Sequence, residues 1–455
     1  YELNEAKGEC VLVIEGKSYT QIKEEEKTKW DNVPILEHME IYYNNLLRLL
    51  IYLYIILLPI LPSKFRLKGV PFNGDIILLF IILLYLLGII IIKNNRKKFI
   101  TKIKSFFSNG LNISILLLII VMFLSTTYAV DKVTALKESL RFCSYIILYF
   151  IIYAEIDSTE KINKALASYI FTCIIISLVS IFDYIKGIGA PQPSSYGINI
   201  RVESLLENSN NLGAFFVMAI FPCIMLLIYE KDKKKKIFYL ISSLLFLFNI
   251  VASFSRNAWL GFAIGCLLII VMYEIRFLIP VAILGGLSLF IPKIYNRLRE
   301  FNDLSQNLSR IKLWETALYM IKDHPILGVG IGNFASLYDE YIKKYRDLRY
   351  CGYKVYHPHN IFLKMQCELG IIGSIAFIVM IIFIVVKLRQ LINREENNFY
   401  KLYYKGFFVS FIAFMSMNLI DNFFSAPKVI AYFWILLALS QSIMNRHNNR
   451  SSIYY

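Results

Sequence analysis

Histidine is scarce in this chain of 455 residues, and its cysteines lack the spacing that metal and redox sites need. The sequence holds five histidines and seven cysteines, with no CxxC pair. Two cysteines, Cys10 and Cys351, lie in polar sequence, and the others lie in or beside apolar runs: Cys143, Cys173, Cys223, Cys266 and Cys367. These absences exclude a zinc knuckle and a CxxC redox centre, and they favour cysteines that pack between helices as small apolar residues.

Charge is also sparse, because charged residues make up 18% of the chain while 57% of it is hydrophobic and the mean hydropathy is +0.54. The apolar residues fall in runs long enough to cross a bilayer. The formal charge of +16 would suggest nucleic acid in a soluble protein, but here Lys and Arg lie mainly in short connections between these runs. We predict an all-α polytopic integral membrane protein, surrounded by membrane lipids and without a nucleic-acid partner.

About twelve apolar runs approach the ~20 residues that a helix needs to cross ~30 Å of hydrocarbon. Nine precede a long polar loop and three follow it: 43–62, 73–92, 111–130, 139–154, 166–185, 211–229, 237–254, 258–273, 277–292, 361–386, 403–424 and 428–445. The predicted organisation is a polar N-terminal cytoplasmic segment (1–42), a membrane domain (43–292), a large, partly helical extracytoplasmic loop (293–360), three further spans (361–445) and a cytoplasmic tail (446–455). The first forty residues have no signal-peptide layout, and we interpret them as a cytoplasmic leader or as part of a longer chain.

The longest polar stretch covers residues 293–360 and contains three of the five histidines, His324, His357 and His359, together with five arginines. Loops of this length are usually functional or disordered. Aromatic residues run through this one, which argues against disorder. We therefore predict a folded extramembrane cap with a site in it.

Basic residues orient the chain. With a cytoplasmic N-terminus, the inner connections are the Lys- and Arg-rich stretches 93–104, 161–164, 231–236 and 387–405, whereas the short outer connections carry fewer charges. The positive-inside rule then puts the 293–360 loop on the outer face. Arg201, in the 187–210 loop, and Arg256, in the turn 253–257, fall on that same face.

Arg256 lies in a tight turn between two apolar runs, where a charge is costly unless it reaches water or a partner. One interpretation is an arginine that snorkels at the membrane interface. The other is an anion site, because Arg256 lies near the N-terminus of the following helix, whose free N–H groups and positive dipole end already favour a phosphate group.

Arg310 repeats this arrangement in the long loop. We expect Ser309 to cap a helix over 311–322 whose apolar stripe packs on the membrane domain, the stripe being Ile311, Trp314, Leu318 and Ile321. Arg310 would then lie at the positive end of the helix. With Arg201 as a third outer arginine, the group indicates an anionic ligand.

The histidines differ in context. His324 opens the sequence HPILGVGIGNF, which lacks the strand and glycine spacing of a dinucleotide site, and we interpret it as a helix stop with tight turns and a structural histidine. His357 and His359 form HPHN directly before an apolar run. His359 can be a structural residue, a metal ligand or a general base, and we favour the base, because an HxH pattern has no third or fourth ligand nearby in the sequence.

The order of these motifs resembles the O-antigen ligase/polymerase family of bacterial envelopes. The motifs are Ser255-Arg256, Arg310 followed by Trp314, the sequence from His324 to Phe334, and HPHNIFL (357–363) with Glu368-Leu369-Gly370. They cover about residues 201–373, and the rest of the chain is similar by hydropathy.

The resemblance implies a metal-independent glycosyltransferase without a cofactor, on the outer face of the cytoplasmic membrane of a bacterium. It would pass a glycan from an undecaprenyl-pyrophosphate carrier to an acceptor hydroxyl, on lipid A core in a ligase or on another carrier-linked unit in a polymerase. Arg256 and Arg310 would hold the pyrophosphate, His359 would activate the acceptor, and Arg201 and His357 would assist binding.

Fixed cations would stabilise the charge that develops on the leaving pyrophosphate. We favour a polymerase of surface polysaccharide. The main alternative is a transporter or flippase of lipid-linked glycans, which predicts charges at mid-span and broken helices in repeated halves. A scaffold without enzymatic activity is a third possibility.

Overall fold

The computed structural model describes residues 35–63, 66–67, 70–71, 73–194, 197–300, 305–349 and 357–451. Positions 1–34 of the predicted N-terminal segment lie outside the described residues, as do Cys10, Cys351 and the last residues of the predicted tail. Contacts divide the chain into two units, Tyr1–Leu49 and Leu50–Tyr455. The helices that surround the candidate site belong to the second unit.

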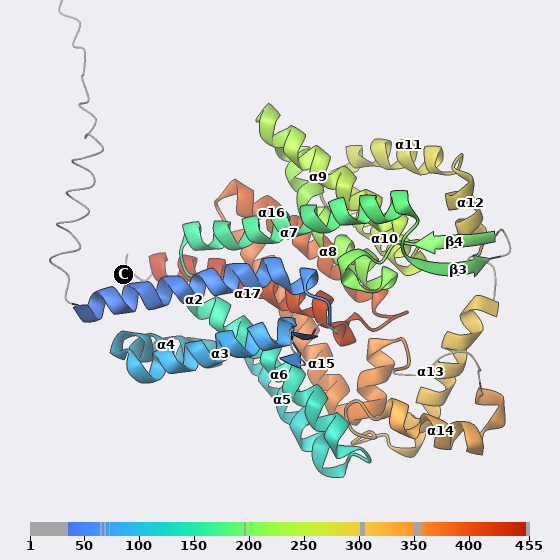
Figure 1. Cartoon of the computed structure of the whole chain (residues 1–455), viewed down its shortest axis with the longest axis horizontal. Coiled ribbons are helices and arrows are strands. Elements are labelled where there is room, and N and C mark those ends of the chain that lie inside the picture. Colours follow the sequence, from blue (N-terminus) through green and yellow to red (C-terminus); the bar gives the residue numbers. More distant parts are fainter. Residues whose placement is uncertain are drawn as a thin grey trace, which may run out of the picture. The chain divides into compact units, whose positions relative to one another are not determined.

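Helices dominate the described part of the chain, and only two short antiparallel hairpins occur among the described residues (Figure 1). The hairpins are β1 (Arg66–Leu67) with β2 (Val70–Pro71) and β3 (Ala190–Ser194) with β4 (Gly197–Arg201). The long helices are α2 (Ile35–Ile60), α3 (Gly74–Ile91), α4 (Lys93–Phe107), α5 (Gly110–Tyr128), α6 (Lys132–Glu155), α7 (Thr159–Lys186), α8 (Ser209–Tyr229), α9 (Lys233–Ala252), α10 (Arg256–Met272), α13 (Ser305–Asp323), α15 (Ile361–Arg394), α16 (Asn398–Met417) and α17 (Pro427–Ser451). Shorter ones are η1 (Ser204–Leu206), η2 (Ile275–Phe277), α11 (Leu278–Ser288), α12 (Pro292–Arg299), α14 (Phe334–Lys344), η4 (Arg346–Leu348) and η5 (Phe423–Ser425).

Short polar side chains start most of the long helices. An Asn, Asp or Ser at the N-cap accepts a hydrogen bond from a backbone N–H of the first turn in α3, α5, α6, α7, α8, α9, α10, α15 and α16. Such caps satisfy N–H groups that have no partner within the helix. The caps therefore fix where apolar sequence becomes helix, including at Ser255 and Asn360 beside the candidate site.

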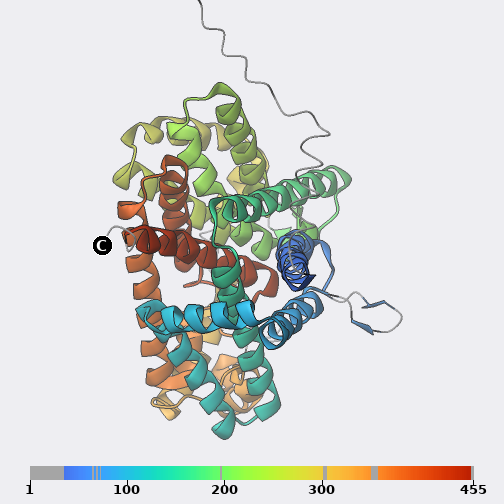
Figure 2. The ribbon, with the colours of Figure 1, turned by 90° about the vertical axis from the view of Figure 1, so that its left-hand side faces the viewer.

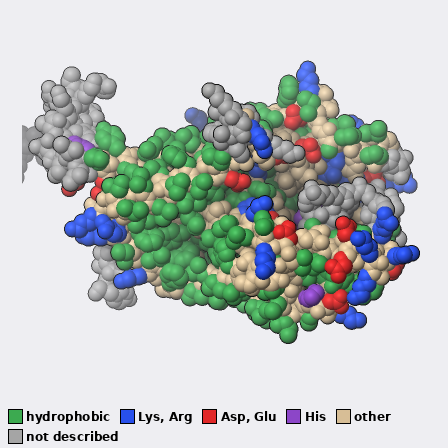
Figure 3. All heavy atoms as spheres, turned by 60° about the horizontal axis from the view of Figure 1, so that its bottom comes forward, with side chains coloured by type: hydrophobic (Ala, Val, Ile, Leu, Met, Phe, Trp, Pro, Cys, Tyr) green, Lys and Arg blue, Asp and Glu red, His purple; other side chains and the backbone are tan. Residues whose placement is uncertain are grey.

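The polytopic membrane architecture is confirmed, but the predicted number of spans is not. Among the described residues, 8 helices are long and apolar enough to cross a membrane, or up to 9 if a bent pair counts as one span. The expected run 277–292 is not one straight helix, because the segment Ile275–Ser288 meets α12 at an angle of 94°. Figure 3 shows hydrophobic side chains over the middle of the surface and charged side chains toward its ends, as a membrane-embedded surface requires.

The core of the second unit lies around α8, α16 and α17, whose residues are largely buried. Gly406 of α16 permits close contact with α8, since a Cβ there would lie 2.4 Å from Cα of Pro222. The Ser410 hydroxyl donates to the carbonyl of Met218 at 2.9 Å across the same contact. These central helices form the support from which the loops of the candidate site extend.

The segment 293–360 is largely helical where it is described, as predicted. Leu313, Ala317 and Met320 of α13 pack with residues of α14 and with Cys367 of α15 in one apolar cluster, which also contains Val329, Phe334, Leu337, Tyr338 and Tyr341. In Figure 1, α12, α13, α14 and the β3–β4 hairpin lie at one end of the helices, and α4 lies at the opposite end. This separation fits the predicted orientation, in which the Lys-rich connections and the long loop are on opposite faces.

Candidate active site

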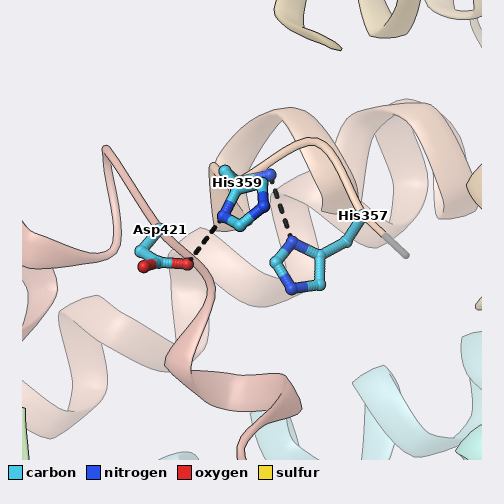
Figure 4. Close-up of side chains that lie close together, drawn as sticks. All are labelled: His357, His359 and Asp421. Carbon is cyan, nitrogen blue, oxygen red and sulfur yellow. Dashed lines mark hydrogen bonds and ion pairs between the residues drawn. The ribbon is translucent and has the colours of Figure 1, made fainter. Parts of the chain in front are cut away.

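His359 lies in the turn directly before α15. Asn360 caps this helix, and its Oδ1 accepts hydrogen bonds from the backbone N–H groups of Phe362 and Leu363 at 2.9 and 3.0 Å. His359 has a φ of +51°, a left-handed conformation that is costly for a residue other than glycine. The turn brings Nδ1 of His359 to 2.9 Å from Oδ1 of Asp421 (Figure 4).

Asp421 is buried in the turn that follows α16. Burial opposes ionisation of its carboxyl group, but the hydrogen bond with His359 and the charges of His359 and Arg310 lower the pKa of Asp421 to about 2. A carboxylate only accepts hydrogen bonds, so Nδ1 of His359 carries the hydrogen and Nε2 is the basic nitrogen of the neutral ring. An imidazole oriented in this way can take a proton from a hydroxyl group.

The sequence analysis missed Asp421, because 62 positions separate it from His359. The expected span 403–424 included it, whereas α16 ends at Met417. The available signal was a carboxylate near the end of an apolar run, where a charge indicates a partner. That signal does not say which of the distant polar residues the partner is.

His357 supports the backbone of His359. Its Nδ1 accepts a hydrogen bond from the His359 N–H at 3.1 Å, and the two rings lie 4.5 Å apart (Figure 4). Burial, together with the charges of His359 and Lys364, lowers the pKa of His357 to about 3. His357 is therefore neutral near pH 7, and its position suits a role in holding His359 rather than in carrying charge.

Asp421 also changes the assessment of a metal site. One ligand atom from each of His357, His359 and Asp421 lies within 4.8 Å of the others, so the carboxylate supplies the third ligand that the HxH pattern lacks in sequence. The hydrogen bonds already described use Nδ1 of both histidines and an oxygen of Asp421. The three side chains are thus close enough to bind a metal ion, but in the structure these atoms form hydrogen bonds instead.

Arg201 connects to this pair through one amide. Its Nη2 donates to Oδ1 of Asn210 at 2.6 Å, and Nδ2 of Asn210 donates to Oδ2 of Asp421 at 3.4 Å. Its Nε donates to the carbonyl of Ser253 at 3.0 Å. Burial and the charges of Arg297 and other arginines lower the pKa of Arg201 to about 10, which leaves it protonated near pH 7. The partners of Arg201 are neutral, so its positive charge is retained.

Arg256 lies at the N-terminus of a helix, as predicted: it is the first residue of α10, and Ser255 is the N-cap. Its Nη1 donates to the carbonyl of Glu300 at 2.7 Å, and its Nη2 donates to Oδ1 of Asn307 at 3.1 Å. These contacts join the start of α10 to the end of α12 and to the first turn of α13. The arginine is therefore held in place by the long loop rather than extended into the membrane interface.

Arg297 is a buried arginine that the sequence analysis did not select. It forms an ion pair with Glu300, and its Nε donates to the carbonyl of Phe254 at 3.0 Å. Since the carbonyl of Glu300 also accepts from Arg256, the Arg297–Glu300 pair fixes the turn that presents Arg256. No feature of the sequence distinguishes Arg297 from the other arginines of the loop, because its role depends on contacts across 43 positions.

The prediction for the helix that carries Arg310 is wrong in detail. α13 begins at Ser305, so Ser309 is not its N-cap and Arg310 is in the second turn. The expected stripe is right only in part: Ile321 packs against the apolar cluster with Leu313, whereas Ile311 and Leu318 are 38% and 54% exposed. Arg310 lies near enough to Asp421 and Arg201 for its charge to lower the pKa of both groups.

The glycine-rich segment that follows α13 packs on a break in α15. The N–H groups of Val329 and Gly330 donate to the carbonyls of Cys367 and Glu368 at 3.0 and 2.8 Å. Gly370 has a φ of +63°, and a Cβ there would lie 2.1 Å from the carbonyl oxygen of Ile326. The predicted helix stop with tight turns is confirmed. Only glycine permits this backbone approach, which fixes α13 against the helix that begins beside His359.

An apolar cavity of about 660 Å³ lies among α8, α9, α10, α11 and α12. Its lining includes Ile250 and Trp259, on either side of the turn that contains Arg256, and Leu298, the neighbour of Arg297. No residue of α11, which forms part of the wall, is buried. Residues next to the turn of Arg256 therefore line one side of the cavity, and an apolar helix without buried residues lines another.

Comparisons with known proteins find a matching family model and several similar sequences. The family model for the O-antigen ligase domain matches residues 241–378, which contain Arg256, Arg310 and both histidines of the pair. A provisionally named polysaccharide ligase of Rickettsia conorii is 26% identical over 343 residues, which are 70% of this chain and 76% of the relative. A similarly named protein of Rickettsia felis is 31% identical over 200 residues, 40% and 46% of the two chains.

A teichuronic acid biosynthesis protein of Bacillus subtilis is 21% identical over 343 residues, covering 70% of this chain and 68% of the relative. The family-model match spans the arginine turn of α10, the long loop and the start of α15. These are the segments whose side chains converge in the structure. These similarities support the resemblance of the chain to the O-antigen ligase/polymerase family.

Proposed function

We propose that this protein is a metal-independent glycosyltransferase that transfers or polymerises undecaprenyl-pyrophosphate-linked oligosaccharides on the outer face of the cytoplasmic membrane of a bacterium. One observation carries the proposal. A continuous path of contacts runs from His359 through Asp421 and Asn210 to Arg201. A candidate general base and a candidate pyrophosphate-binding cation thus share one polar network.

The proposed reaction uses these groups in one displacement. The acceptor hydroxyl oxygen bonds to the anomeric carbon of the donor while Nε2 of His359 takes the hydroxyl proton. The bond between that carbon and the pyrophosphate oxygen breaks, and the electron pair leaves on the lipid pyrophosphate. Arg201, Arg256 and Arg310 stabilise the charge that develops there. Asp421 stabilises the imidazolium, which afterwards returns its proton to water.

The apolar cavity supports a lipid-linked donor. Its lining continues from the turn around Arg256 into the space between α9, α10 and α11. An isoprenoid chain that occupies this cavity would leave its pyrophosphate at the arginines. α11 is the wall through which the chain would enter from the bilayer.

The names of the relatives support a polysaccharide as the product, since they refer to polysaccharide ligases and to teichuronic acid biosynthesis. Of the two reactions in the family, we favour polymerisation, in which the acceptor is another carrier-linked unit. Positions 293–360 then face the outside, where such units are assembled. Lys and Arg in the connections at the opposite end support this orientation.

The test uses the full chain, purified and placed in nanodiscs, with a lipid-linked oligosaccharide as donor. The expected result is longer glycan on a lipid carrier and release of undecaprenyl pyrophosphate in equal amount. Reconstituted vesicles with donor in one leaflet serve as the second measurement. Movement of intact donor across the bilayer without a change in glycan length would support the transporter alternative and contradict the proposal.

A further inference from the structure

α4 is a short basic helix between two membrane spans, and the proposed function does not use it. It covers Lys93–Phe107, 15 residues with six Lys or Arg and no acidic residue. One residue separates it from α3, and Ser108 and Asn109 separate it from α5. Both neighbours are candidate spans. α4 therefore lies near a membrane surface. Figure 2 shows α4 along its length, with α3 next to it.

The inner face of α4 packs on the protein. Phe106 is buried against the rings of Tyr149, Phe150 and Tyr153. Two of the six cations belong to this face, because Lys98 Nζ lies 2.9 Å from Glu155 Oε2 and Lys102 Nζ lies 5.6 Å from the centre of the Tyr153 ring. Contacts on this face fix the rotation of the helix about its axis.

The opposite face carries the other four cations, Lys93, Arg96, Lys97 and Lys104, and all four are exposed. They form no ion pair within the described part of the chain. Ile100 and Phe107 lie in the same stripe and are 47% and 52% exposed. Residues 93, 97, 100, 104 and 107 follow the spacing of four and three residues that keeps side chains on one helix face. Figure 3 shows Lys and Arg side chains gathered at the end of the surface where α4 lies, next to hydrophobic side chains.

We propose that this stripe of α4 is a binding surface for the anionic headgroups of phospholipids in the adjacent leaflet. The cations pair with phosphate groups, while Ile100 and Phe107 insert between the headgroups. Alternation of basic and apolar side chains on an interfacial helix is the pattern that membrane surfaces bind. A soluble acidic partner would account for the four cations but not for the two exposed apolar side chains between them.

The experiment compares lipids retained by the purified full chain from an equimolar mixture of phosphatidylglycerol and phosphatidylcholine, counted by native mass spectrometry. The test variant replaces Lys93, Arg96, Lys97 and Lys104 with Gln. The matched control replaces the four lysines that begin α9, Lys233, Lys234, Lys235 and Lys236, which are equally exposed but have no apolar residue among them. Gln preserves helix propensity, so both variants should fold.

We expect the wild type and the α9 control to retain phosphatidylglycerol in preference, and the α4 variant to lose that preference by ~10-fold or more. Ile100→Ser with Phe107→Ser should give a smaller loss with all cations present. An unchanged preference in the α4 variant, or an equal loss in the control, would overturn the proposal. Displacement of the lipid by millimolar inorganic phosphate at constant ionic strength would likewise contradict it, since that result indicates a site for free phosphate.

Discussion

The histidine–aspartate pair and the arginines differ in how the protein holds them. His359 has an ionised partner, Asp421, whose oxygen lies 2.9 Å from Nδ1. Arg201 instead donates to a carbonyl and an amide oxygen, at Ser253 and Asn210. The contacts that orient Arg256 include the same two kinds of oxygen.

This difference suits the two tasks. A base gains from a nearby carboxylate, which stabilises the protonated ring and selects one tautomer. A cation that binds an anion would lose attraction if a carboxylate neutralised it, so a neutral oxygen orients the guanidinium and preserves its charge. Arg297 is the contrasting case, since its ion pair with Glu300 suits a structural role.

Removing the base should have the largest effect. His359→Ala should reduce sugar transfer by ~10²-fold or more, while donor affinity changes little because the arginines are intact. Transfer rate and donor binding are measured separately on purified protein in nanodiscs. His324→Ala, at an exposed histidine outside the pair, is the control. A wild-type transfer rate in His359→Ala would show that His359 is not the base.

Removing a pyrophosphate-binding cation should weaken both donor binding and sugar transfer. Arg256→Ala should lose ~10–100-fold in donor affinity and in transfer, because a charge-assisted contact is worth ~1.5–3 kcal/mol. Lys at this position should rescue in part, since it restores charge without the two-pronged geometry. The exposed Arg346 of the same loop provides the control, as Arg346→Ala. Equal losses in Arg256→Ala and Arg346→Ala would mean that the effect is only one of net charge.

Asp421→Asn tests the partner of the base. The amide retains the shape but no longer stabilises an imidazolium, so transfer should fall by ~10-fold and donor affinity should stay constant. A variant with full activity at every pH would show that His359 acts without Asp421.

His357 should make stability depend on pH. Its pKa is about 3 in the folded protein against ~6.5 when unfolded, so the unfolded chain binds more protons between these values. Stability should therefore fall as the pH is lowered from ~6.5 towards 3. His357→Asn keeps an acceptor for the His359 N–H and removes this titration, which flattens the dependence of the unfolding temperature on pH. His324→Asn should leave the slope as in the wild type.

Removal of divalent metals should have the smallest effect. If His357, His359 and Asp421 act as a hydrogen-bonded group, transfer should continue at the same rate after treatment with EDTA. The measurement is the transfer rate before and after chelation, followed by addition of Mg²⁺, Mn²⁺ or Zn²⁺. Loss of activity that a metal restores would instead make these three residues a metal centre.

Much of this architecture could be predicted from sequence. Apolar runs indicate membrane helices, the run that follows Arg256 places this arginine near a helix N-terminus, and the glycines after His324 indicate turns. Each of these features depends on neighbours along the chain. The sequence predicts helix boundaries less well where tertiary packing determines the first residue of a helix. Ser309 is as good a cap as Ser255 in isolation, yet α13 begins four residues earlier.

The sequence by itself determined that the protein is a helical membrane protein with one long polar loop and a set of histidines and arginines in it. Tertiary structure alone decided that His359 pairs with Asp421, that Asn210 links this pair to Arg201, and that Arg297 fixes the turn of Arg256. The physical reason is the distance along the chain over which each interaction acts. Caps, turns and hydrophobic length act over a few residues, whereas a buried carboxylate finds its partner through the packing of helices that are far apart in the chain.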